Sequence, residues 1–120
     1  MKQSRIVLRG IEFVGRHGVE ERERIEGRAF RAHVSVDVDA LEGFHSDRIS
    51  DTVDYTQISK IIEDIGTGSS CFLVERLAEK MAQACLQLEH VTRVELELYK
   101  RVSGIPGNPR WVGVCIVRER

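Results

Sequence analysis

The chain lacks the features that mark several large classes of protein. It has no apolar run of about 18 residues or more, the length that a membrane-spanning helix needs. The short apolar segment near its start is interrupted by Arg9 and Glu12, which is unlike a secretory signal. Its 18 basic and 19 acidic side chains give a formal net charge of -1, without the basic excess that is typical of nucleic-acid-binding proteins. We therefore expect a cytoplasmic protein that binds neither membrane nor nucleic acid.

Motifs for metals and cofactors are also missing. The three cysteines form no Cys-x-x-Cys pair, and their odd number fits a reducing compartment better than a disulfide framework. We expect all three to be small buried apolar residues: Cys71, Cys85 and Cys115. The four histidines show no metal-ligand spacing, and there is no Gly-rich nucleotide loop and no Gly-x-Ser-x-Gly. The sequence thus predicts no metal site and no cofactor.

The pattern of apolar residues predicts four strands and two helices. Apolar and polar residues alternate as in strands, and the alternation changes phase at Gly10, which suggests a β-bulge. Apolar residues at helical spacing predict helices over 56–65 and 72–88. The strands are predicted over 5–14, 30–40, 92–100 and 111–117.

The order strand, strand, helix, helix, strand, strand indicates an α+β fold. A chain of 120 residues is long enough for one core, so we expect a single domain over 1–120. Two helices can cover one face of a four-stranded antiparallel sheet, but nothing in the chain covers the sheet edges or the second apolar face of the last strand. We therefore infer a homo-oligomer.

Two charged residues stand out because their neighbours are apolar. Lys100 continues the apolar phase of the third strand, and desolvation there disfavours an ammonium, which lets a lysine accept a proton near neutral pH. The alternative is that the strand has ended and the side chain reaches water. Glu75 lies near the start of the second helix. Its carboxylate either pairs with a flat pair of N–H groups on a ligand or only stabilises the helix start.

Two further segments have ordinary explanations. The stretch 18–27 is crowded with glutamate and arginine, and most such runs are solvated surface. The stretch 51–55 precedes a helix, so one of its polar side chains caps the helix and Tyr55 packs beside it.

Five short motifs nevertheless follow one another along the whole chain. They are Leu-x-Gly-Ile-x-Phe-x-Gly-x-His-Gly-Val over 8–19, Glu-Arg-x-x-Gly-x-x-Phe over 23–30, Asp-Thr-Val-Asp-Tyr over 51–55, Leu-Val-Glu-x-Leu-Ala-Glu over 73–79, and Ile-Pro-Gly over 105–107 with Val-Gly-Val over 112–114. Together with Lys100, their order and spacing resemble the dihydroneopterin aldolase family of folate biosynthesis. Each motif alone is weak, and it is their combination that is specific.

The resemblance implies the tunnelling fold, in which the four-stranded sheets of several subunits join into an oligomeric barrel, here an octamer of two tetrameric rings. It also implies that the substrate is a pterin, 7,8-dihydroneopterin, which is split into 6-hydroxymethyl-7,8-dihydropterin and glycolaldehyde. The ring imine of the substrate accepts the electron pair of the broken carbon bond. The family therefore uses no metal, no cofactor and no Schiff base, and needs only an acid, a base and a rigid grip on the pterin.

The resemblance assigns three catalytic residues. Lys100 matches the catalytic lysine, which moves protons through water, and Tyr55 matches the tyrosine that closes the site from a neighbouring subunit and protonates the intermediate. Glu23 matches the glutamate near the trihydroxypropyl side chain, although Glu21 offers a competing register.

The resemblance also assigns the binding residues. Glu75 matches the pterin anchor, which pairs with the amino group and a ring N–H. Backbone groups of Val53 and Val74 line the ring, and Glu23 and Tyr55 also contact the substrate.

Two positions depart from the common pattern of the family and leave alternatives open. Arg101 follows the lysine where many members have proline, and Val14 stands where many have tyrosine. A cation close to the lysine would favour its neutral form and attract an anionic substrate, so epimerisation of dihydroneopterin or its triphosphate remains an alternative. A non-catalytic pterin-binding protein of the same fold and a zinc-dependent relative of the pyruvoyl-tetrahydropterin synthase type are two more.

Overall fold

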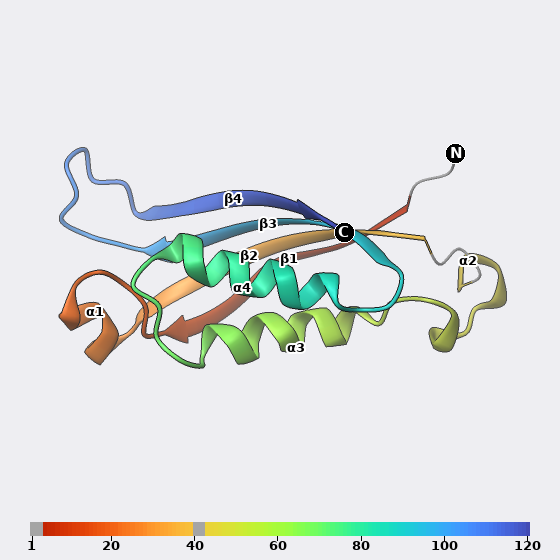
Figure 1. The fold of residues 1–120 in the computed structure, drawn as a ribbon. Helices are drawn as coiled ribbons and strands as arrows, with labels where there is room; N and C mark the ends of the chain where they lie inside the picture. The colour runs from red at the N-terminus through yellow and green to blue at the C-terminus, as the bar shows by residue number, and fades with distance from the viewer. Residues whose placement is uncertain (1–3, 40–42) are drawn as a thin grey trace.

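Four antiparallel strands form one sheet in the computed structural model, which describes residues 4–39 and 43–120 (Figure 1). They lie side by side in chain order: β1 (Ser4–Gly15), β2 (Arg28–Val38), β3 (Val91–Arg101) and β4 (Trp111–Glu119). Between β2 and β3 come two longer helices, α3 (Tyr55–Gly66) and α4 (Val74–Leu86). Shorter elements are α1 (Glu21–Glu26), α2 (Gly43–Ser46) and the 3-10 helix η1 (Ile49–Asp51). The predicted α+β fold with a four-stranded antiparallel sheet is confirmed.

Each strand turns one row of apolar side chains toward the helices, because successive residues of a strand point to opposite faces of the sheet. In β2 the buried residues alternate with half-buried ones, as Ala32, Val34, Val36 and Val38 show. In β1 the pairing with β2 skips from Leu8 to Ile11, and Gly10 has a φ of 79°. The predicted bulge at Gly10 is therefore confirmed. It keeps Leu8 and Ile11 both directed toward the core.

The two longer helices cover the same face of the sheet (Figure 1). Helix α3 begins after Asp54, whose carboxylate accepts a hydrogen bond from the Thr56 N–H at 2.9 Å, and it buries Ile58 and Ile62 against the sheet. Helix α4 buries one stripe, made of Leu77, Ala78, Met81, Ala82, Cys85 and Leu86. It begins two residues later than the sequence pattern predicts. Within the described residues, the other face of the sheet carries no helix.

The chain reverses direction several times at one end of the molecule (Figure 1). Three elements end here: β1, α3 and β3. Three others begin here, namely β2, α4 and β4, and the short helix α1 lies at the same end. The start of α3 lies at the opposite end, beside α2. This arrangement decides which of the candidate residues can meet within one chain.

One sequence-based prediction is wrong, and one helix is not predicted. Cys71 and Cys85 are buried, but Cys115 is exposed, because it lies on the face of β4 that no helix covers. The charged stretch 18–27 also contains the unpredicted helix α1. Among residues 4–39 and 43–120, no helix is long and apolar enough to cross a bilayer. In the same ranges, no group of three or more His, Cys, Asp or Glu residues is placed to hold a metal ion.

Candidate active site

Lys100 and Glu23 form an ion pair at the end of β3 that is largely shielded from solvent. Lys100 lies on the helix-covered face, in phase with Leu98, and its register partners are Phe30 of β2 and Val112 of β4. Its Nζ is 2.7 Å from Glu23 Oε2, and the two side chains are only 11% and 13% exposed. The prediction that Lys100 is desolvated is confirmed.

Helix α1 brings Glu23 to the lysine. The Arg24 guanidinium donates to the Gly18 carbonyl oxygen at 2.8 Å and lies 4.7 Å from the centre of the Phe72 ring. The Gly18 N–H donates to the Cys71 carbonyl oxygen at 3.0 Å, which ties this segment to the loop before α4. A Cβ on Gly18 would collide with the Glu23 side chain. Glycine is therefore needed at this position for the carboxylate to reach Lys100.

The two glutamates that compete in the sequence differ in the structure. Glu21 is exposed in the first turn of α1, whereas Glu23 is half-buried and contacts Lys100. The expectation that 18–27 is solvated surface is therefore wrong for Glu23 and Arg24, because both side chains turn inward to polar partners that lie outside the helix.

His17 joins three segments beside this ion pair. Its ring is fully buried, and its Nδ1 accepts a hydrogen bond from the Cys71 N–H at 3.0 Å. The proton of the neutral ring is then on Nε2, which donates to the Gly66 carbonyl oxygen at 2.7 Å. Burial lowers the pKa of His17. The Gly66 carbonyl acts in the opposite direction, and the charges of Lys80 and Lys100 lower the pKa further. A neutral histidine thus fixes the end of β1 against α3 and the loop before α4.

An open hollow of about 200 Å³ lies beside the ion pair. It is lined by Glu20, Glu23, Arg28, Lys100, Val102, Ser103, Ile105 and Val112. The Ile-Pro-Gly motif over 105–107 thus reaches the site through its first residue. Arg28 and Ser103 are not among the residues predicted from the sequence. Arg28 comes two residues before Phe30, and Phe30 is the register partner of Lys100. This spacing would place Arg28 near the lysine, but the pairing of the two strands is visible only in the assembled sheet.

Val74 and Glu75 form the first turn of α4, at the same end of the molecule as the end of β3 (Figure 1). Val74 is half-buried and Glu75 is exposed. Within residues 4–39 and 43–120, the Glu75 carboxylate has no ion-pair or hydrogen-bond partner. It is therefore available to a ligand.

Tyr55 and Val53 lie at the opposite end of α3. This helix has 12 residues, so about 17 Å separate Tyr55 from Gly66, the residue that His17 binds. Val53 is buried, whereas Tyr55 is 63% exposed. A second open hollow, of about 520 Å³, is lined here by Leu8, Tyr55, Thr56, Ser59, Lys60 and Glu63.

One chain therefore divides the predicted site residues into two groups. Lys100 and Glu23 are in contact, with Glu75 and Val74 at the same end of the molecule, whereas Tyr55 and Val53 lie at the other end. A site that uses both groups must be built from two copies of the chain. The exposed position of Tyr55 fits a residue that a neighbouring copy would cover.

Arg101 lies on the other face of the sheet from Lys100. Adjacent residues of a strand point to opposite faces, so Arg101 is directed away from the face that holds Lys100. Its guanidinium lies 5.7 Å from the centre of the Trp111 ring on the uncovered face. The prediction that Arg101 acts on Lys100 as a nearby cation is therefore wrong. The arginine that lines the hollow at Lys100 is Arg28.

The fold and the site define an α+β protein whose antiparallel sheet ends in a shielded lysine–glutamate pair beside an open hollow. Residues 6–117 match the family model of dihydroneopterin aldolase. Because this match spans almost the whole chain, the protein belongs to the dihydroneopterin aldolase family, and the resemblance seen in the sequence is confirmed.

Individual relatives agree with this assignment. A dihydroneopterin aldolase of Streptomyces coelicolor is 34% identical over 116 residues, which cover 97% of this chain and 98% of the relative. One of Staphylococcus epidermidis is 34% identical over 115 residues, 95% of each chain. The solved structure of Escherichia coli dihydroneopterin aldolase in complex with neopterin matches with a TM-score of 0.86 at 23% identity, covering 96% of this chain and 98% of that one. At this identity, the structural likeness shows that the fold is shared.

Proposed function

We propose that this protein is an aldolase of folate biosynthesis that splits 7,8-dihydroneopterin into 6-hydroxymethyl-7,8-dihydropterin and glycolaldehyde. The observation that carries the proposal is the shielded contact between Lys100 and Glu23 beside an open hollow, since a titratable pair in such a place suits proton transfer. Membership of the family and the names of the relatives support the choice of substrate.

The proposed reaction is a retro-aldol cleavage. A base takes the proton of the hydroxyl group on the second side-chain carbon, the bond between the first and second side-chain carbons breaks, and glycolaldehyde leaves. The electron pair of that bond passes into the ring imine and gives an enamine. A proton added to the first side-chain carbon then restores the imine and gives the hydroxymethyl product. The substrate supplies the electron sink, so we infer a reaction without metal, cofactor or Schiff base.

Lys100 and Glu23 have complementary roles in this proposal. Lys100 moves protons to and from the substrate through a bound water. Glu23 holds the ammonium at 2.7 Å and faces the trihydroxypropyl side chain, so it positions both the lysine and the substrate hydroxyls. Tyr55 of a neighbouring copy closes the site and protonates the enamine.

Glu75 anchors the pterin in this proposal. The two oxygens of its carboxylate, which has no partner in the described part of the chain, match the amino group and the adjacent ring N–H of a pterin. Backbone groups of Val74 and of the neighbouring copy's Val53 line the ring. The site is thus shared between copies, and we propose a homo-octamer of two tetrameric rings in the cytoplasm, joined through the free edges of β1 and β4.

The test is product analysis with protein that has been treated with a chelator. We expect 6-hydroxymethyl-7,8-dihydropterin and glycolaldehyde in equal amounts from 7,8-dihydroneopterin, with an epimerised side product from re-addition of glycolaldehyde. Lys100→Ala should lower kcat at least about 100-fold, since general acid–base catalysis contributes about that much or more, while pterin binding persists. Arg93→Ala, which removes a cation on the opposite face of β3 that is paired with Glu119, is the matched control.

Because Lys100→Ala leaves the Glu23 carboxylate without its partner, its melting temperature and oligomeric mass must be compared with those of the wild type. Loss of product after chelation would contradict the metal-free reaction, and unchanged turnover in Lys100→Ala would contradict the catalytic role. Binding without any turnover in the wild type would indicate a non-catalytic pterin-binding protein. A preference for the triphosphate, with epimer as the main product, would indicate an epimerase.

A further inference from the structure

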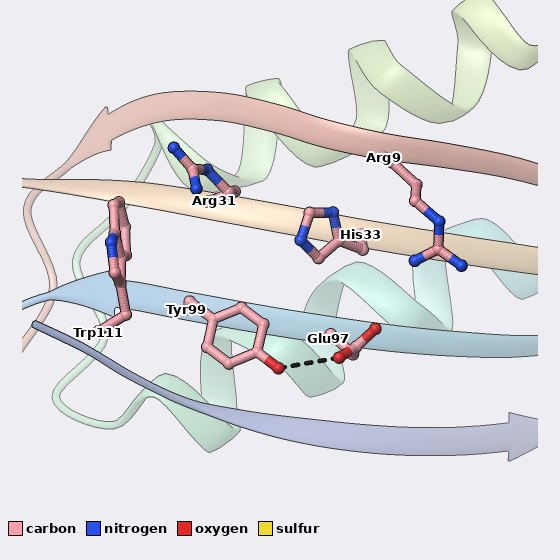
Figure 2. Close-up of a pocket in the computed structure, with 6 residues that line it drawn as sticks. All are labelled: Arg9, Arg31, His33, Glu97, Tyr99 and Trp111. Carbon is pink, nitrogen blue, oxygen red and sulfur yellow. Dashed lines mark hydrogen bonds between the residues drawn. The ribbon is translucent and has the colours of Figure 1, made fainter. Parts of the chain in front are cut away.

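The uncovered face of the sheet carries a hollow of its own, of about 440 Å³ (Figure 2). All four strands contribute to its lining, which is made of Arg9, Arg31, His33, Glu97, Tyr99 and Trp111. It is separate from the proposed active site, because Lys100 points to the opposite face. Its volume lies within the range that is usual for small-molecule sites. Joining copies through the edges of β1 and β4 would leave this face uncovered.

The bulge in β1 builds a cationic corner in this hollow. The Gly10 N–H donates to His33 Nδ1 at 2.9 Å, so the proton of the neutral ring lies on Nε2, which is free to donate to a ligand. Arg9, the residue before the bulge, lies beside His33 in Figure 2. Within residues 4–39 and 43–120, its guanidinium has no carboxylate partner. Two donors, one of them charged, thus line the same corner of the hollow.

Aromatic rings line the rest of the hollow. The Tyr99 ring lies against Gly113 of β4, where a Cβ would be only 2.8 Å from Tyr99 Cδ1. Beyond it, Trp111 is held by Arg31, whose guanidinium lies 4.8 Å from the ring centre and also binds Glu12 at 2.8 Å. A flat ligand can therefore pack on fixed aromatic surfaces next to the cationic corner.

Glu97 restricts which ligands fit. One of its carboxylate oxygens accepts the Tyr99 hydroxyl at 2.8 Å, as Figure 2 shows, and the other is left for a ligand. Glu97 is the register partner of His33, so a bare anion in the cationic corner would be repelled by a carboxylate nearby. A ligand that also carries an N–H donor would instead bind this carboxylate.

We propose that this face binds a phosphomonoester that carries an amino-substituted aromatic ring, the chemistry of a nucleoside monophosphate. The phosphate lies between Arg9 and the Nε2–H of His33, the ring packs on Tyr99 and Trp111, and the amino group donates to Glu97. The site goes beyond the proposed aldolase function and does not depend on it.

The chain contains a single tryptophan, so Trp111 fluorescence reports on this hollow. Titration with adenosine or cytidine 5′-monophosphate should quench it to saturation. Arg9→Gln should weaken binding at least about tenfold, the loss expected for one charge-assisted hydrogen bond. The matched control is Arg5→Gln, on the same strand and face, where the guanidinium already pairs with Asp37 at 2.7 Å, and it should leave the affinity unchanged. Both variants should keep the wild-type turnover of dihydroneopterin.

Glu97→Gln provides a second test that does not touch the cations. It should weaken binding of adenosine 5′-monophosphate but not of ribose 5-phosphate, which has no ring amino group, whereas Glu95→Gln should change neither. Equal affinity for inorganic phosphate would indicate an adventitious ion only and would overturn the proposal. Equal affinity for adenosine without its phosphate, equal losses in Arg9→Gln and Arg5→Gln, or quenching caused by face-to-face pairing of two sheets, seen as a doubled mass, would also overturn it.

Discussion

At the scale of single residues, His17 binds backbone groups that lie 49 and 54 positions further along the chain. Its pKa is below the ordinary value of 6.5, first because the ring is buried and also because Lys80 and Lys100 are near. Below pH 6.5 the unfolded chain therefore binds a proton that the folded chain does not, so the free energy of unfolding falls as the pH falls. The contribution of the neutral ring is complete above about pH 6.5 and is lost progressively below it.

We predict that the wild type loses stability between pH 6.5 and 5 with a slope from His17 of at most about 1.4 kcal/mol per pH unit, the limit for one proton. His17→Asn should be less stable at pH 8, because at least one backbone bond is lost, and should show a shallower decline toward pH 5. Urea unfolding across this pH range measures both. His45→Asn, at an exposed histidine of α2, should retain the wild-type slope. Parallel pH profiles for the wild type and His17→Asn would contradict this role.

The same scale shows what a single sequence can reveal about the site. The phase of β3 identifies Lys100 as desolvated, because alternation along one strand is a local pattern. The contact with Glu23 is not local, since it depends on Gly18 and Arg24 turning α1 inward. Only the resemblance to a family assigned Glu23 a role. The predicted effect of Arg101 on Lys100 is wrong because it treats two residues that are adjacent in sequence as adjacent in space. On a strand their side chains point to opposite faces.

At the scale of elements, the site depends on the close packing of β1 against the end of α3. Gly66 is the last residue of α3, and a Cβ there would be 2.6 Å from Phe13 Cζ. Its carbonyl also accepts the hydrogen bond of His17. Propensity alone would make Ala the better helix residue by about 1 kcal/mol. The close packing against Phe13 predicts instead that Ala at this position lowers the free energy of unfolding.

We predict that Gly66→Ala destabilises the fold by about 1–3 kcal/mol, the usual cost of overpacking a core. Chemical denaturation measures the change. Phe13→Leu in the same chain should recover part of the loss, because a smaller side chain makes room for the added methyl group. The two changes should therefore couple in a double-mutant cycle. Strictly additive effects, or a stabilised Gly66→Ala variant, would contradict the packing argument.

Elements with a clear period are predicted well, and those without one are not. The strands, the two longer helices and the bulge at Gly10 follow from alternating or helical spacing of apolar residues. Helix α1 has only six residues, and almost all are charged, so no apolar face marks it. Cys115 is predicted wrongly because β4 is apolar in both phases, and the sequence does not show that helices cover only one face of the sheet.

At the scale of the whole molecule, the two groups of candidate residues lie far apart. Tyr55 and Val53 are at one end of a molecule about 50 Å long, and Lys100, Glu23 and Glu75 are at the other. The uncovered edges of the sheet already predict an oligomer from the sequence alone. The separation between the two groups of candidate site residues, in contrast, is visible only in the fold. Because of this separation, an experiment that mixes variant subunits can test whether the site is shared.

We predict that Lys100→Ala and Tyr55→Ala subunits restore activity when they are unfolded together and reassembled. A shared site is intact when the lysine side comes from a Tyr55→Ala subunit and the tyrosine side from a Lys100→Ala subunit, so an equal random mixture should regain about a quarter of the wild-type activity. Each variant reassembled alone should remain nearly inactive, and each mixed equally with the wild type should retain about half. A mixture of the two variants that is no more active than either parent would place Tyr55 and Lys100 in one subunit's site or remove Tyr55 from catalysis. The first outcome disagrees with the fold, because the whole length of α3 lies between Tyr55 and Gly66, the residue that His17 binds near Lys100.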